Sequence, residues 1–429
     1  MAHNAETEGA ASEQRIMRSA YRWNTAGGIL FALQSTIMLI ALTRVCDVYV
    51  AGVFTIAFAN ANLFMQISNF GMRKFQASDR RGEFSFRTYR ASRVSTCTAM
   101  IVASLAYIAY SGLTLGYDQE KILVMVVMCL FKAIDSFEDV FTGGYQVQGR
   151  LDLGAKMLTI RLLIVSAVFI GFIVVTGDLL SSSIATTVSS AVVLGAQIGY
   201  VRRAYNLPNR EIGPTVSSVL RLLRACVPLF LGDFLLFYAG NAARYAIDVF
   251  LDDAAQAYFG YIAMPVFVVT LLAGFIYSPL ITSLTDQWHE GKVGIFAVRF
   301  AKLSLVVAGI TVVCAIGVWL VGVPVLNALY NTELESYKLE LCVLMVGGGF
   351  LAFTTLLTVG ITIIRFQLIL VPLYAISALF ARFISYYAVA NFSLAGAAWS
   401  YLAVMALSSV VFALAFAFGI WWLRPKVKQ

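Results

Sequence analysis

The sequence predicts an all-α polytopic membrane protein of about twelve transmembrane helices. Of its 429 residues, 60% are hydrophobic and only 13% are charged, so the chain carries more apolar surface than a soluble core of ordinary composition would bury. A spanning helix needs about 20 apolar residues, and segments of that length recur along the whole chain with short polar interruptions. We therefore expect no sizeable soluble domain.

The predicted spans follow one another at short intervals. They cover residues 22–44, 49–70, 92–113, 121–144, 157–177, 182–203, 218–243, 255–284, 299–321, 339–364, 367–389 and 394–423. The polar stretch 204–217 lies between the sixth and seventh, so we predict two six-helix lobes, 22–203 and 218–423, with polar ends at 1–21 and 424–429. Because six is an even number, homologous halves would be related by an axis along the membrane normal.

Basic residues predict the orientation. With the amino terminus inside, and with basic residues near a span end assigned to the adjoining loop, 25 of the 31 Lys and Arg residues belong to inner segments and 3 to outer loops, while Arg44, Lys132 and Arg382 are assigned to spans. Since Lys and Arg concentrate in cytoplasmic loops, both termini are predicted to be cytoplasmic. The net charge of +8 then reflects membrane topology, and we expect no nucleic-acid partner.

Motifs for catalysis and cofactors are missing from the sequence. The six cysteines are scattered without a CxxC pair, which favours packed, reduced thiols over a metal site or disulfides. No GxxxxGK[ST] loop for ATP is present, and the only histidines, His3 and His289, lie outside the predicted spans. We expect no cofactor and no enzymatic activity. The first apolar run, Trp23–Thr43, is too long for the core of a signal peptide, so we expect it to remain as a span.

Charged residues inside the predicted spans are the best functional candidates, because a charge at membrane depth costs a few kcal/mol or more. In the fourth span, Lys132, Asp135, Glu138 and Asp139 recur at spacings of three and four, which places Lys132 over Asp135 on one helix face. Two interpretations stay open: a self-neutralising ladder that lets a polar helix pack, and acids that couple or gate transport.

The second half of the chain offers fewer candidates. Asp233 lies deep in the seventh span, whereas Arg244 and Asp248 approach the outer surface, where a solvated face explains them equally well. Arg382, in the eleventh span, has no acidic residue in the same helix. It requires either an acid from another helix or an anionic ligand.

The first inner loop, from Gly71 to Arg81, is the most basic segment. Contact with anionic lipid, at about 1 kcal/mol for each basic residue, is one explanation. In the other, Arg73 and Lys74 lie at the inner mouth of a cavity and bind a phosphate group.

Several segments resemble the Wzx-type polysaccharide flippases of the multidrug, oligosaccharidyl-lipid and polysaccharide exporter (MOP) superfamily. They are Ala41–Val45, Ala51–Ala59, Phe70–Arg73, Lys132–Lys156 and Asn241–Asp248, followed by Gly260-Tyr261 and Pro279. Where that family often has Leu-Gly after the arginine of the first span, this chain has Cys46-Asp47, so its turn there is expected to differ.

The resemblance implies two lobes around a central, partly cationic cavity that opens alternately to each side. Its cargo would be a polyprenyl-pyrophosphate-linked oligosaccharide, carried from the inner to the outer leaflet of a bacterial inner membrane for cell-surface polysaccharide assembly. The other implied partners are membrane lipids, a coupling proton or sodium ion, and further polysaccharide-assembly membrane proteins. The candidate substrate-binding cations are Arg44, Arg73, Lys74, Lys132, Arg244 and Arg382. The candidate coupling or gating acids are Asp135, Glu138, Asp139, Asp233 and Asp248.

Rival functions stay open at this point. A cation-coupled drug exporter of the same superfamily would use buried acids such as Asp135, Glu138 and Asp233 as coupling groups, and a lipid II flippase is a further alternative. A sugar ligase or acyltransferase would need a sizeable outer loop or a His-centred site, and the sequence predicts neither. A purely structural membrane protein is disfavoured by the buried charges.

Overall fold

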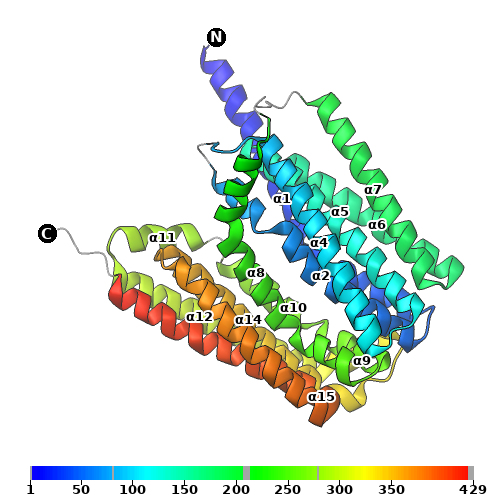
Figure 1. The fold of residues 1–429 in the computed structure, drawn as a ribbon. Coiled ribbons are helices and arrows are strands. Elements are labelled where there is room, and N and C mark those ends of the chain that lie inside the picture. The colour runs from blue at the N-terminus through cyan, green and yellow to red at the C-terminus, as the bar shows by residue number, and fades with distance from the viewer. Residues whose placement is uncertain (1, 80–81, 206–212, 278–279, 424–429) are drawn as a thin grey trace. The chain divides into compact units, whose positions relative to one another are not determined.

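The computed structural model describes residues 2–79, 82–205, 213–277 and 280–423, and all the regular elements in these ranges are helices (Figure 1). This confirms the predicted all-α class. The centre of the predicted linker at 206–212, Pro279 and the predicted tail at 424–429 lie outside the described residues.

The chain divides into two compact units, as predicted for two lobes. The first runs to Asp233 and the second begins at Phe234, so the boundary falls within one long helix, α8 (Val216–Phe250). This boundary follows the predicted linker, and the assignment of 204–217 as the connection between the lobes stays a prediction. We describe each unit by itself.

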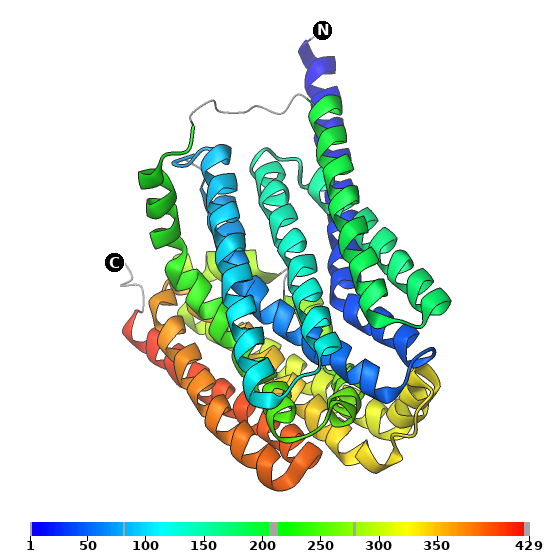
Figure 2. The same cartoon turned by 45° about the vertical axis from the view of Figure 1, so that its right-hand side comes forward.

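The first unit is a bundle with α5 at its centre. Its elements are α1 (Ala2–Thr43), α2 (Val48–Asn69), α3 (Met72–Ser78), α4 (Phe86–Leu115), α5 (Gln119–Val147), α6 (Leu151–Thr176), α7 (Leu179–Ala204) and the first part of α8. Figure 2 shows its long helices, blue to green, running alongside one another. Because α5 packs against α2, α4, α6 and α7, most of its polar side chains are enclosed by protein.

Short polar caps set the helix ends in this unit. Asp47, Ser85, Asp118 and Asp178 each accept a hydrogen bond from a backbone N–H in the first turn of α2, α4, α5 and α7. The departure at Cys46-Asp47 therefore has a local purpose, since Asp47 caps α2 through the backbone N–H of Val50.

The second unit contains the remainder of α8 and the helices up to residue 422. They are α9 (Asp253–Ala263), α10 (Val266–Tyr277), α11 (Ile281–His289), α12 (Val293–Gly317), a π-helical turn Val318–Gly322, α13 (Val323–Tyr330), α14 (Lys338–Ile363) and α15 (Leu370–Trp422), with short 3₁₀ turns at Glu335–Tyr337 and Gln367–Ile369. Helix α14 packs against α10, α12 and α15. A core of buried aromatic and aliphatic residues, including Phe296, Phe300 and Phe416, joins these helices.

The number of spans agrees with the prediction of about twelve. Nine helices of the described residues are long and apolar enough to cross a membrane. Helices α5 and α8 are outside this set, although both are long enough, and α15 counts once although Ser393, with φ 53° and ψ −134°, divides it into two helices. That break lies between the predicted spans 367–389 and 394–423.

Candidate functional site

A buried network of ion pairs surrounds α5 in the first unit. The ammonium of Lys132 lies 2.9 Å from Asp135 Oδ2, and Arg161 of α6 donates to Asp135 Oδ1 at 2.6 Å. Arg161 also donates through Nε to Glu138 Oε2 at 2.9 Å. The side chains of Lys132 and Arg161 are 1% and 0% exposed, so this network is shielded from solvent and lipid. This contact confirms the predicted placement of Lys132 and Asp135 on one face of α5.

Lys132 has further partners besides a carboxylate. Its ammonium donates to Gln34 Oε1 of α1 at 3.1 Å and lies 4.4 to 5.1 Å from the ring centres of Phe31, Phe58 and Phe131. Cation–π contacts of this kind stabilise a desolvated ammonium. The structure thus supplies partners for Lys132 within the first unit itself.

A second network lies on another face of α5. Asp139 accepts from Arg73 of α3 through Oδ1 and from Arg93 of α4 through Oδ2, both at 3.0 Å. Arg93 is fully buried and also donates to the carbonyl of Ser68 and, at 3.1 Å, to Ser136 Oγ. One aspartate therefore links α3, α4 and α5, while Glu138, one residue earlier, faces α6.

The remaining candidates of the first unit are more exposed. Lys74 Nζ lies 2.6 Å from Asp233 Oδ1, and the two side chains are 63% and 29% exposed. An exposed pair of this kind contributes little, about 0 to 1 kcal/mol. Arg44 lies one residue past the end of α1, in an exposed turn.

Sequence reasoning did not single out Arg93 and Arg161, although each is central to one network. Both were counted among the inner basic residues that predict the orientation. The available signal was position: α6 begins at Leu151, so Arg161 lies ten residues inside a largely apolar helix, about 15 Å from its start. Gln34 and Ser190, which hydrogen-bond to Lys132 and Arg161, gave no comparable signal.

In the second unit, Arg244 and Arg382 contact aromatic rings. The guanidinium of Arg382 lies 3.3 Å from the ring centre of Tyr386, and that of Arg244 lies 5.7 Å from the ring centre of Phe259. Neither arginine forms an ion pair among the described residues of the chain. Tyr386 lies edge-on against Phe250, and Asp248, half-buried, is near enough to Tyr386 to interact electrostatically.

Buried tyrosines near Arg244 are a second feature of this unit. Tyr261 and Tyr330 are fully buried and stack with ring centres 4.5 Å apart. Tyr330 and Tyr401 lie close enough to Arg244 to interact with its charge. Arg244 and Arg382 contact rings instead of an acid, so their guanidinium groups are suited to bind anionic groups. The neighbouring tyrosine rings are suited to bind groups rich in hydroxyls.

Comparison with known proteins places this geometry in a known architecture. No family model and no curated protein matches the sequence. A solved MOP superfamily transporter from Pyrococcus furiosus, described as having a binding pocket of reverse polarity that suggests a different function, matches with a TM-score of 0.61 and 15% identity over 96% of each chain. A Vibrio cholerae MATE transporter matches with a TM-score of 0.60 and 11% identity over 96% of this chain and 98% of that one. An inward-facing multidrug resistance MATE family transporter of the MOP superfamily matches with 0.58 and 15%, over 92% and 94%.

The chain has the MATE-type transporter fold. At 11–15% identity these matches show the fold alone. Within this fold, the α5 acids Asp135, Glu138 and Asp139 of the first unit are each in contact with a base, and the second unit carries arginines on aromatic rings.

Proposed function

We propose that this multi-pass membrane protein is an alternating-access flippase that carries a polyprenyl-pyrophosphate-linked oligosaccharide from the inner to the outer leaflet of a bacterial inner membrane. One observation carries the proposal: the three acids in the middle of α5 are each in contact with a base, and the four bases outnumber them. The acids Asp135, Glu138 and Asp139 contact the bases Lys132, Arg161, Arg73 and Arg93.

The balance of charge distinguishes an anionic cargo from a cationic one. A cationic drug is attracted by uncompensated carboxylates, and these networks provide none on Asp135 or Asp139. A pyrophosphate is attracted by guanidinium groups, which bind its oxygens in bidentate fashion. The second unit offers Arg244 and Arg382 for this role, and its tyrosine rings and hydroxyls suit the sugar units.

A cation-coupled drug exporter is the second candidate, and one atom favours coupling by protons. Glu138 Oε1 is buried and makes no hydrogen bond within the described structure, whereas Oε2 is held by Arg161. An unsatisfied buried carboxylate oxygen is a place where a proton can bind. Proton coupling is compatible with either cargo. Glu138 therefore supports a proton gradient as the energy source, and the choice between the two cargoes rests on the balance of charge.

The deciding experiment compares charged and uncharged cargo in proteoliposomes. A fluorescent polyprenyl-pyrophosphate-linked disaccharide is followed by its protection from a membrane-impermeant quencher, in parallel with uptake of a cationic dye. We expect protein-dependent flipping of the labelled lipid, competed by unlabelled polyprenyl pyrophosphate and not by polyprenol. Gradient-driven dye transport with no competition by the pyrophosphate lipid would instead establish the drug exporter.

Arg382 provides the matched variants. Replacement by alanine should slow flipping about tenfold or more, because a charged hydrogen bond contributes about 1.5 to 3 kcal/mol. Arg382→Lys should be partly active, since the positive charge is kept and the bidentate donor geometry of the guanidinium group is lost. Arg203→Gln, which removes an exposed arginine at the end of α7, is the control.

A further inference from the structure

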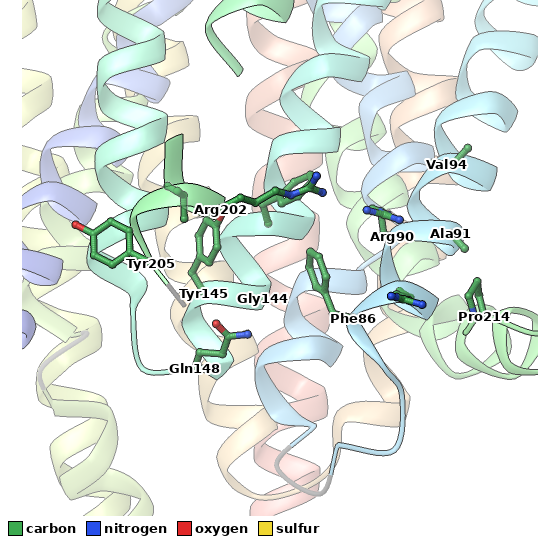
Figure 3. A pocket seen from close by; sticks show the side chains of 13 residues that line it. Phe86, Arg90, Ala91, Val94, Gly144, Tyr145, Gln148, Arg202, Tyr205 and Pro214 are labelled. Carbon is green, nitrogen blue, oxygen red and sulfur yellow. The ribbon is translucent and has the colours of Figure 1, made fainter. Parts of the chain in front are cut away.

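A cationic cavity lies within the first unit, apart from the α5 ion-pair networks. Its volume is about 910 Å³, and it is bounded by α4, α5, the end of α7 and Pro214 (Figure 3). Three arginines line it, Arg87 and Arg90 from α4 and Arg202 from α7, and no acidic side chain is among the described lining residues. We propose that this cavity binds the phosphate-bearing headgroup of an anionic membrane lipid. This inference is independent of the cargo proposed above.

The wall along α4 changes from cationic to apolar. Arg87, Arg90, Ala91 and Val94 follow at spacings of three, one and three, so they share one helix face. From Arg87 to Val94 the helix rises about 10 Å into a predicted span. Val94 is 51% exposed. A lipid has the same gradient, with phosphate at one end and acyl chains at the other, whereas a free phosphate would leave the apolar end unused.

The arginines of α4 are placed against the preference of the helix itself. The first turn of a helix favours negative charge, because its unpaired N–H groups carry a partial positive charge. Helix α4 has no acid in its first turn, and Arg87 lies there with Arg90 one turn later. Arg202, at the end of α7, follows the helix preference, but its neighbour Arg203 does so equally and does not line the cavity. An anion in the cavity explains why the three guanidinium groups gather there.

The aromatic walls of the cavity are held in place by their own contacts. Phe86 lies edge-on against Phe141, and a Cβ added to Gly144 would come within 2.8 Å of the Phe86 ring. Tyr205 is covered by the guanidinium of Arg150 at 4.9 Å, and Arg150 is itself fixed by two hydrogen bonds to Asp152. The cavity is therefore shaped before any ligand arrives, which lowers the entropic cost of binding.

Native mass spectrometry of the full chain tests the proposal. The protein is titrated with phosphatidylglycerol and, separately, with phosphatidylcholine of identical acyl chains. We expect the Arg90→Gln, Arg202→Gln double variant to bind phosphatidylglycerol about tenfold or more weakly than the unaltered protein, with phosphatidylcholine binding unchanged. The control Arg18→Gln, Arg203→Gln removes the same charge from exposed positions outside the cavity and should bind as the unaltered protein does. Equal phosphatidylglycerol affinity in the double variant and its control would overturn the proposal.

A second pair of variants keeps every charge. Ala91→Trp fills the cavity and should weaken phosphatidylglycerol binding to a similar degree, whereas Thr98→Trp, exposed on the same helix and outside the cavity, should not. Inorganic pyrophosphate and a polyprenyl monophosphate serve as competitors. Displacement of phosphatidylglycerol by the polyprenyl monophosphate and not by inorganic pyrophosphate supports a lipid headgroup as the ligand. Equal displacement by inorganic pyrophosphate would contradict the lipid assignment. Flipping of the disaccharide-linked lipid is measured in the same variants. An unchanged flipping rate beside weakened phosphatidylglycerol binding shows that this cavity is distinct from the site of the proposed cargo.

Discussion

Asp135 is the residue on which the first unit depends most closely, because one carboxylate is bonded to two cations at once. Lys132 and Arg161 reach it from α5 and α6, and Arg161 extends to Glu138. Removal of one partner from a buried pair leaves an uncompensated charge, which costs about 3 to 5 kcal/mol. The same residues are therefore sensitive structural positions as well as candidates for coupling.

Arg161→Gln should lower the free energy of unfolding by about 3 to 5 kcal/mol, since Asp135 loses one of its two bases and Glu138 loses the base that holds its Oε2. Arg161→Lys should recover only part of this, because one ammonium lacks the fork that reaches both carboxylates. Thermal unfolding in detergent measures the loss, with Arg203→Gln as the control. A melting temperature of Arg161→Gln equal to that of the unaltered protein would show that the network is not structural.

Glu138→Gln tests the coupling proposal at the single oxygen without a partner. The amide keeps an oxygen for Arg161 and cannot exchange a proton, so we expect transport that no longer responds to a proton gradient in a protein that still folds. Asp135→Asn, whose carboxylate is engaged through both oxygens, should instead act mainly on stability. Transport by Glu138→Gln with unaltered pH dependence would remove Glu138 from the coupling proposal.

Among the elements, α15 shows how a local backbone feature creates two spans from one helical run. Ser393 adopts a positive φ, and three residues later Gly396 approaches the preceding helix so closely that an added Cβ would lie 2.0 Å from the carbonyl oxygen of Ala388. Backbone cannot yield as a flexible side chain does. The turn between these helices therefore requires a glycine.

Gly396→Ala should lower the free energy of unfolding by about 1 to 3 kcal/mol, the usual cost of forcing extra volume into a packed site. Gly171→Ala is the matched control, because Gly171 lies within α6 with nothing within 4 Å of an added Cβ. It should be neutral or stabilising by up to about 1 kcal/mol, since alanine is the better helix former. The melting temperatures of the two variants decide the matter: equal values would refute the proposed close turn.

At the scale of the whole molecule, the orientation in the membrane remains a prediction from charge. The loop bias of Lys and Arg places the ends of α4 at Gly116 and of α13 near Asn331 outside, and the end of α3 inside. The six free cysteines must first be replaced, because Cys46 and others are partly accessible.

Single cysteines at Gly116 and Asn331 in that background should react with an impermeant maleimide added to intact cells. A cysteine at Ser78 should react only after the membrane is permeabilised. The opposite labelling pattern would reverse the orientation, and with it the direction of the proposed flipping.

The sequence by itself determined the features that depend on local composition. Apolar length predicted the helices and their number, and the spacing of three along α5 predicted the contact of Lys132 with Asp135, because both follow from helix geometry. Only the tertiary structure decided which helices meet. Arg161 and Arg93 approach the α5 acids from 23 to 46 positions away in the chain, and neighbouring Glu138 and Asp139 turn to different partners. Nor does the pattern of α4 and α7 reveal a shared cavity, since residues far apart in sequence come together only through packing, which no local periodicity encodes.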